Sequence, residues 1–203
     1  MSSFLLIRHG LTDTAGKKAT GRLGGFRLNE AGRRQARTLA GRLADSRIAA
    51  VISSPLERTQ ETAGAIAERH GLAVETNAAF HEFDSGEWAG SEFDRLRDTP
   101  EWKAFTKFRS TLRAPGGESL LDAQYRAVAE MERIRARALV GAVAIVTHAD
   151  VIRAVLAHYL AIPLDLSFRF EISPASVTVL EVNTWGPTLR VLNETGAIPL
   201  PKK

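Results

Sequence analysis

One stretch near the start of the chain constrains the fold more than any other: the apolar run FLLI at residues 4–7, which leads directly into Arg8, His9 and Gly10. A short continuous apolar run is typical of a strand that is buried on both faces of a parallel sheet. Gly10 allows the backbone to turn sharply where such a strand ends. Because open α/β sheets bind ligands beyond the carboxyl ends of their strands, we expect Arg8 and His9 to project at the edge of a binding crevice.

The chemistry of these two side chains suits an anionic ligand. Arginine presents a fixed fork of donors to phosphate or carboxylate. Histidine can be a nucleophile, a general base or a metal ligand. The competing hypothesis is that Arg8 and His9 only hydrogen-bond to the backbone at the strand end, and the tripeptide alone does not decide between the two.

Buried strands alternate with helices through most of the chain. Two further apolar runs, at residues 48–52 and 142–148, predict buried strands, and residues 72–79 predict a short one. Helices are predicted at about 30–44 with Asn29 as N-cap, from Ser54 as N-cap and Pro55 to about 70, from the capping box Ser119 and Asp122 to about 139, and from Ala149 onward. This alternation implies right-handed crossovers and a largely parallel sheet.

Two regions depart from this alternation. Residues 91–114 carry aromatic residues, among them Phe93, Trp102, Phe105 and Phe108, at roughly helical spacing. We interpret these residues as core, with a lid over the crevice as the alternative. Near the end of the chain, residues 168–172, 177–179 and 189–191 predict antiparallel or edge strands that finish the sheet.

Composition argues against several classes of function. With 203 residues, 44% of them hydrophobic, the chain fits a single domain over residues 1–203. It has no cysteine, which suits a cytoplasmic location, and we recognise neither a signal peptide nor an apolar run of transmembrane length. The net charge is +4, and the arginines are spread over several predicted helices, so we expect no nucleic acid partner. A small anionic substrate needs only a local basic cluster. The sequence does not indicate the oligomeric state.

The loop at residues 11–27 is polar, glycine-rich and basic. Because it follows directly on His9, we expect part of it to reach the substrate, including Thr12, Gly21 and Arg22. The alternative for a basic loop of this kind is simple solvation.

Arg58 is predicted in the first turn of a helix, where free backbone N–H groups attract anions. An arginine at this position opposes the helix dipole, so a bound ligand explains it better than helix stability does. The alternative is an ion pair with Glu61 or Glu82. His148 is a second histidine at the end of a predicted strand, again beside a predicted helix N-terminus.

No motif for a metal ion or a cofactor is recognised. The two strand-end histidines are far apart in sequence, and no His-x-x-x-His pair or carboxylate cage accompanies them. The chain has no G-x-S-x-G elbow, no Walker A loop and no dinucleotide fingerprint. We therefore expect neither a metal ion nor a cofactor.

Motifs spread along almost the whole chain resemble those of the histidine phosphatase superfamily, the phosphoglycerate mutase-like proteins. The segments that carry this resemblance are LLIRHGLT at 5–12, LNEAGRRQA at 28–36, ISSPLERTQETA at 52–63, HEFDSGEWAG at 81–90, PGGES at 115–119 and IVTHADVIR at 145–153. A three-letter motif alone would be weak, but these segments occur in the order that the family has.

The resemblance implies a three-layer α/β/α sandwich with a mostly parallel central sheet and an antiparallel edge. It implies that His9 attacks phosphorus and becomes a phosphohistidine, while Arg8, Arg58 and His148 hold the phosphoryl oxygens. Glu82 matches the acid that protonates the leaving oxygen and then activates water. Substrate contacts are expected also from Thr12, Gly21, Arg22 and Ala149. The reaction is then the metal-independent hydrolysis of a small phosphomonoester.

The chemistry of these residue types agrees with such roles. Phosphoryl transfer needs mainly positioning and charge neutralisation, which two arginines, an imidazole and a helix N-terminus can supply. Nearby cations disfavour protonation of a nucleophilic histidine, and we expect its other ring nitrogen to donate to a backbone carbonyl in the Gly10 loop. For the acid, Glu82 has rivals in Asp84, Glu87 and Glu118, which residue type alone does not exclude.

Two departures from the family pattern favour hydrolysis over a mutase. Mutases of this family usually carry asparagine six residues after the histidine, where this chain has Ala15. The segment that follows Glu82 is short, with little material to keep water from a phosphoenzyme. A mutase-type phosphotransferase and an inactive phosphate-binding module remain the alternatives. Asp150, beside His148, either belongs to a helix N-terminus or rejects highly charged substrates.

Overall fold

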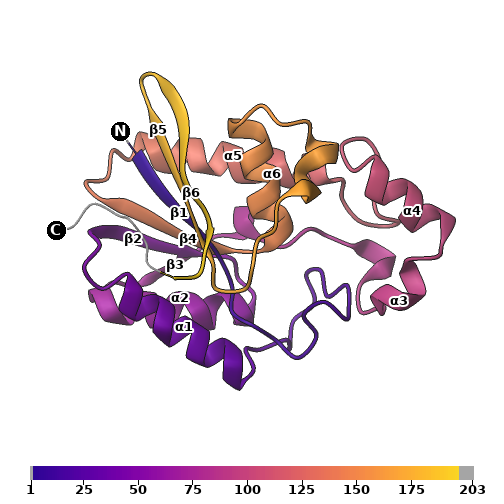
Figure 1. Cartoon of the computed structure of the whole chain (residues 1–203), viewed down its shortest axis with the longest axis horizontal. Coiled ribbons are helices and arrows are strands. Elements are labelled where there is room, and N and C mark those ends of the chain that lie inside the picture. Colours follow the sequence, from indigo (N-terminus) through magenta and orange to yellow (C-terminus); the bar gives the residue numbers. More distant parts are fainter. Residues whose placement is uncertain (1, 197–203) are drawn as a thin grey trace.

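The computed structural model describes residues 2–196, which form one six-stranded sheet flanked by helices (Figure 1). The strands are β1 Ser2–Arg8, β2 Ile48–Ser53, β3 Val74–Thr76, β4 Ala142–Thr147, β5 Val177–Asn183 and β6 Gly186–Glu194. The α-helices are α1 Glu30–Arg42, α2 Glu57–His70, α3 Phe93–Leu96, α4 Pro100–Lys107, α5 Leu120–Ala136 and α6 Ala149–Tyr159. Short 3-10 helices span Ala78–Phe80, Gly86–Trp88 and Leu164–Arg169.

The strand order is β3-β2-β4-β1-β5-β6, with β1 to β4 parallel and β5 and β6 antiparallel. A mostly parallel sheet with an antiparallel edge is therefore confirmed. Arg8 pairs with Thr147, and Ser53 pairs with Val146, so β1, β2 and β4 end at the same edge of the sheet. The residues that follow these three strands are thus brought together.

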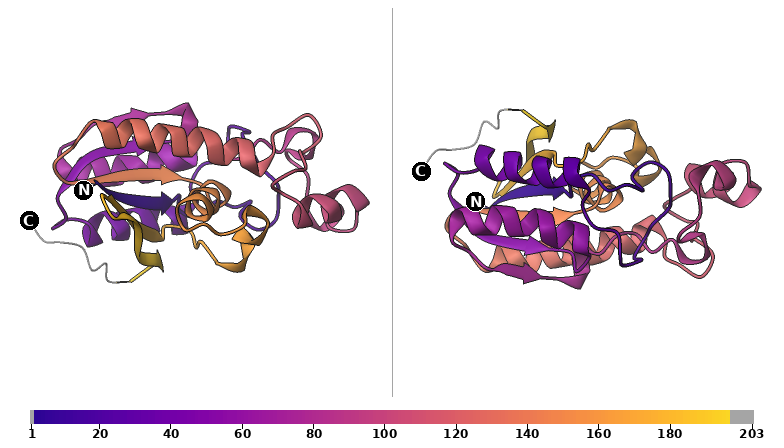
Figure 2. Two further views of the ribbon diagram at one scale, coloured as in Figure 1. Left: turned by 90° about the horizontal axis from the view of Figure 1, so that it is seen from above. Right: turned by 90° about the horizontal axis from the view of Figure 1, so that it is seen from below.

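Helices cover both faces of the sheet, as Figure 2 shows. On one face, α1 and α2 pack on a buried cluster that includes Leu5, Ile7 and Val51. On the other, α5 and α6 pack on a cluster that includes Phe4 and Leu6. Alternate residues of β1 thus point to opposite cores, which explains why its sequence is a continuous apolar run. The three-layer α/β/α sandwich is confirmed.

Two of the three predicted helix caps are confirmed. The Asn29 side chain accepts a hydrogen bond from the Gly32 N–H at the start of α1, and Ser119 and Asp122 form the capping box of α5. The prediction of Ser54 as an N-cap followed by Pro55 is wrong, because α2 begins at Glu57.

The reason lies in the bonds that Ser54 makes. Its hydroxyl lies 2.9 Å from Nε2 of His148, and its carbonyl oxygen accepts hydrogen bonds from the side chains of Thr59 and Gln60. The backbone at Leu56 is still extended, and α2 has no side-chain N-cap. Ser54 is therefore bonded to a strand-end histidine, and the helix starts two residues later than the sequence suggests.

The predicted strand at residues 168–172 is wrong. Leu164–Arg169 is a 3-10 helix, and the residues after it are irregular. Side chains satisfy the backbone there, since Arg8 Nη1 donates to the Ile172 carbonyl at 2.6 Å and Arg153 Nε donates to that of Phe170 at 3.2 Å. Two arginines thus replace the strand partner that the alternating sequence had predicted.

Residues 91–114 contain the short helices α3 and α4 and form a side lobe of the fold (Figure 1). The core interpretation holds for Phe105, which is 2% exposed, but is wrong for Phe108, which is 55% exposed. Phe93 and Trp102 pack against the same cluster as Phe105. No helix within residues 2–196 has the length and apolar character needed to cross a membrane.

Candidate active site

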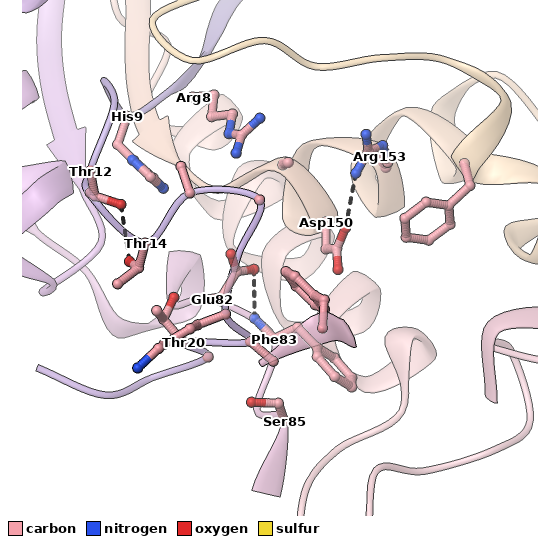
Figure 3. A pocket seen from close by; sticks show the side chains of 18 of the residues that line it. Arg8, His9, Thr12, Thr14, Thr20, Glu82, Phe83, Ser85, Asp150 and Arg153 are labelled. Carbon is pink, nitrogen blue, oxygen red and sulfur yellow. Dashed lines mark hydrogen bonds and ion pairs between the residues drawn. The ribbon is translucent and has the colours of Figure 1, made fainter. Parts of the chain in front are cut away.

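A cavity of about 630 Å³ opens at the edge where β1, β2 and β4 end (Figure 3). Seven of the nine residues predicted for the site line this cavity; they are Arg8, His9, Thr12, Gly21, Arg58, Glu82 and Ala149. The other two, Arg22 and His148, do not line the cavity and lie behind the residues that form its wall. The topology therefore brings together residues as far apart in the sequence as Arg8 and Ala149.

His9 is held in one orientation by its own loop. Its Nδ1 lies 2.7 Å from the Gly10 carbonyl oxygen, so Nδ1 carries the proton and Nε2 carries the lone pair. The Gly10 N–H donates in turn to Thr62 Oγ1 at 3.1 Å. Burial, reinforced by the charges of Arg58 and Arg8, lowers the pKa of His9 to about 3. The imidazole is thus neutral at physiological pH, with a free nitrogen at the cavity.

Gly10 is required for a reason other than the sharp turn that we expected. Its backbone does not adopt a positive φ. Instead, a Cβ atom at this position would lie 2.7 Å from the carbonyl oxygen of Gly32, in the first turn of α1. The loop that carries His9 packs directly on the α1 backbone, which fixes the position of the imidazole.

His148 lies beside His9 and is completely buried, with 5.2 Å between the centres of the two rings. Its Nε2 lies 2.9 Å from Ser54 Oγ, and its Nδ1 lies 3.6 Å from Glu82 Oε2. Burial, with a further contribution from Arg58, lowers the pKa of His148 well below its ordinary value. The second histidine is therefore also neutral.

Arg58 is 1% exposed, yet two of its nitrogens, Nε and Nη1, have no hydrogen-bond partner within residues 2–196. The third, Nη2, donates to the Gly21 carbonyl at 2.9 Å. The alternative partner Glu61 accepts instead from the Leu28 N–H and lies 4.0 Å from Arg33. Because a buried guanidinium without partners is costly, its free donors indicate that the cavity is built for an anion.

Glu82 faces the same cavity (Figure 3). One of its oxygens accepts the Phe83 N–H at 2.9 Å, and the other is the one near His148. Burial, followed by repulsion from Asp150, raises the pKa of Glu82 to about 7, although Arg58 opposes this change. Such a carboxyl group can be a proton donor and a proton acceptor near neutral pH.

The three rival carboxylates do not line the cavity. Glu87 is exposed. Asp84 accepts the Gly86 N–H, and Glu118 accepts the Asp84 N–H at 2.9 Å. Of the four candidates, Glu82 is the one that lines the cavity.

A clamp of three charged residues holds the backbone of Glu82. Arg22 Nε and Arg126 Nη2 donate to the Glu82 carbonyl at 3.0 and 3.2 Å, respectively. Glu118 accepts from both guanidinium groups at 2.8 Å. Arg22, predicted to bind substrate, is therefore engaged behind the wall. Arg126 was missed, because an arginine within a long helix carries no motif that distinguishes it.

The outer wall of the cavity combines charge with aromatic rings. Asp150 lies between Arg109 and Arg153, at 3.3 and 3.1 Å from their Nη1 atoms. Both guanidinium groups lie over the ring of Phe168, at 3.5 and 4.7 Å from its centre. Asp150 is thus both the second residue of α6 and an ion-paired group at the cavity (Figure 3).

Within the described residues, no group of three or more histidine, cysteine, aspartate or glutamate side chains could hold a metal ion. The groups that face the cavity include guanidinium groups, a neutral imidazole and a carboxyl group of raised pKa. This set can bind a phosphoryl group, attack it with nitrogen and deliver a proton to the leaving oxygen.

Comparison with known proteins agrees with this chemistry. The sequence profile of the histidine phosphatase superfamily (branch 1) matches residues 4–195. Over 199 residues the chain is 33% identical to the bifunctional protein Rv2228c of Mycobacterium tuberculosis. The aligned region covers 95% of this chain and 54%, about half, of that protein. Over 200 residues it is 29% identical to phosphoserine phosphatase 1 of Hydrogenobacter thermophilus, with coverage of 96% and 93%.

A solved structure is similar along nearly its whole length. The native structure of mycobacterial glucosyl-3-phosphoglycerate phosphatase Rv2419c matches with a TM-score of 0.86 at 27% identity. The match covers 95% of this chain and 98% of that one. The likeness thus includes the sheet, both helical layers and the segments that surround the cavity.

Proposed function

The chain belongs to the histidine phosphatase superfamily, and from this premise we propose that it hydrolyses a small-molecule phosphomonoester through a phosphohistidine formed on His9. The observation that carries the proposal is the neutral His9, with Nδ1 bound to a carbonyl and Nε2 free, beside the unpaired donors of buried Arg58. We further propose that residues 1–203 act as one domain and that the enzyme is cytoplasmic.

In the first step, the substrate phosphoryl group lies between Arg8 and Arg58, whose free N–H donors neutralise its equatorial oxygens. His9 Nε2 attacks phosphorus, and the bond from phosphorus to the leaving oxygen breaks. Protonated Glu82 gives its proton to that oxygen, so the product leaves as an alcohol. His148 lies behind the wall, beside His9 and with its Nδ1 3.6 Å from Glu82 Oε2, and supports these two groups.

In the second step, the phosphohistidine is hydrolysed. Glu82, now a carboxylate, takes a proton from water, and the water oxygen attacks phosphorus. The phosphorus–nitrogen bond breaks, and His9 returns to its neutral form as inorganic phosphate leaves. The pKa of Glu82, raised to about 7, suits both halves of this cycle, because neither protonation state is strongly favoured near neutral pH.

The proposal is tested with purified protein and p-nitrophenyl phosphate, with and without a chelator. We expect phosphate release at the same rate in both samples, because the transferring groups belong to the protein. Phosphoryl transfer between phosphoglycerates without net hydrolysis would indicate a mutase instead. Binding of phosphate without turnover would indicate an inactive phosphate-binding module, and loss of activity in chelator would contradict metal independence.

Replacement of Arg58 by alanine should weaken phosphate binding and slow the chemistry together. Loss of such a charge-assisted contact costs about 2–4 kcal/mol, so we expect kcat/KM to fall by roughly 30- to 1,000-fold. The measurement is kcat/KM together with inhibition by inorganic phosphate. Arg69→Ala, an exposed arginine in the last turn of the same helix, is the control. Wild-type kinetics in Arg58→Ala would leave Arg58 with a structural role only.

A further inference from the structure

The cavity is much larger than a phosphoryl group needs. Its volume of about 630 Å³ lies within the range of sites that enclose a whole small molecule. Five aromatic side chains line the part of the cavity beyond the residues proposed to bind the phosphoryl group; they are Phe83, Phe93, Trp102, Phe105 and Phe168. We call these five residues the aromatic wall. They come from the loop after Glu82, from the side lobe and from the 3-10 helix before β5.

Four rings of the aromatic wall, those of Phe83, Phe93, Trp102 and Phe105, are packed against one another. Phe83 lies 5.3 Å from Phe105 between ring centres, Trp102 lies 6.1 Å from Phe105, and Phe93 lies 5.8 Å from Trp102. Phe83 and Phe105 are nearly buried. A surface of interlocked rings is already in place before a ligand binds, so little ordering is needed to bury an apolar group against it.

The charges nearest to this wall are only partly compensated, because two guanidinium groups share one carboxylate. Arg109 and Arg153 share Asp150, and both stack on Phe168. Arg153 also donates to the Phe170 carbonyl. Asp150 itself points into the cavity (Figure 3), so an anionic group placed there would meet this carboxylate together with the two guanidinium groups.

We propose that the aromatic wall binds the leaving group, and that the preferred leaving group carries an aromatic or similarly bulky apolar part. This inference rests on the proposed function, because it names the substrate class of the same site. It separates this enzyme from one that selects its ester by a second anionic group.

The test compares three esters of primary alcohols, so that the leaving oxygens are chemically alike. They are n-propyl phosphate, 3-phenylpropyl phosphate and a propyl phosphate whose far end, away from the phosphate, carries a carboxylate. We expect kcat/KM for the phenylpropyl ester to exceed that for the propyl ester by about 10- to 100-fold, and to exceed that for the carboxylated ester as well. Equal values for the first two esters, or a preference for the carboxylated one, would overturn the proposal and give Lys18 and Arg97, which also line the cavity, the leading role.

Two variants locate the preference in the wall. In Trp102→Ala the ratio of the phenylpropyl to the propyl ester should fall toward one, whereas Trp185→Ala, on the 97% exposed tryptophan between β5 and β6, should retain it. If Trp102→Ala does not fold, Phe168→Leu serves, since Phe168 is 40% exposed. A ratio that neither wall variant lowers would contradict the assignment. Hydrolysis of none of the esters, p-nitrophenyl phosphate included, would instead contradict the proposed function itself.

Discussion

Replacement of His9 by alanine is expected to abolish turnover and leave the fold intact. The side chain provides the attacking nitrogen, and no other group at the cavity can form the same intermediate. Removal of a nucleophile typically costs roughly 10⁴- to 10⁶-fold in kcat. The measurement is hydrolysis of p-nitrophenyl phosphate, with circular dichroism to establish that the variant is folded.

The matched control is His158→Ala, an exposed histidine in the last turn of α6. It should retain wild-type activity. Rapid quenching of the wild-type enzyme with substrate should also trap acid-labile phosphate on the peptide that contains His9. Phosphate trapped on the His148 peptide and absent from His9 would overturn the assignment of the nucleophile.

Replacement of Glu82 by glutamine should damage substrates with poor leaving groups most. An alkyl phosphate leaves as a strongly basic alkoxide and needs a proton, whereas p-nitrophenolate needs it little. We expect the first chemical step to slow by roughly 10²- to 10⁴-fold on the alkyl ester and much less on the aryl ester. Hydrolysis of the phosphohistidine should slow as well, so the aryl ester should show a burst of nitrophenol followed by slow turnover.

The pH dependence gives an independent signature of the same group. Because the acid form of Glu82 donates the proton, the rate on an alkyl ester should fall as pH rises above about 7, the pKa of this carboxyl group. That alkaline limb should be absent in Glu82→Gln. Glu82→Gln and its matched control Glu87→Gln, an exposed carboxylate five residues away, are compared in single turnovers. Equal losses on alkyl and aryl esters would falsify the acid role, since an orienting residue would affect both alike.

The fold could be predicted from the sequence where local pattern and tertiary environment agree. The run at residues 4–7 faces a core on each side, so burial and apolar character coincide along the whole strand. Because the buried strands could be recognised in this way, the sequence also predicts that β1, β2 and β4 end at one edge of the sheet. The proximity of His9, Arg58 and His148 follows from that prediction. Parallel topology places strand ends side by side even when they are far apart in sequence.

The failures arose where side chains compete with local backbone preferences. Ser54 has the composition of a helix cap, but its hydroxyl bonds to His148, which no local pattern reveals. Residues 168–172 alternate like a strand, but guanidinium groups from β1 and α6 satisfy their carbonyls. Arg126 reaches Glu82 across 44 residues of sequence. Each of these contacts is long-range and polar, and periodicity does not register it.

The clamp of Arg22, Glu118 and Arg126 grips position 82 by its main chain. Both guanidinium groups donate to the carbonyl oxygen of this residue. Every amino acid has that oxygen, so the support is indifferent to which side chain the position carries. The side chain at position 82 can therefore be exchanged, shortened or removed by a single substitution while the backbone around it keeps its conformation.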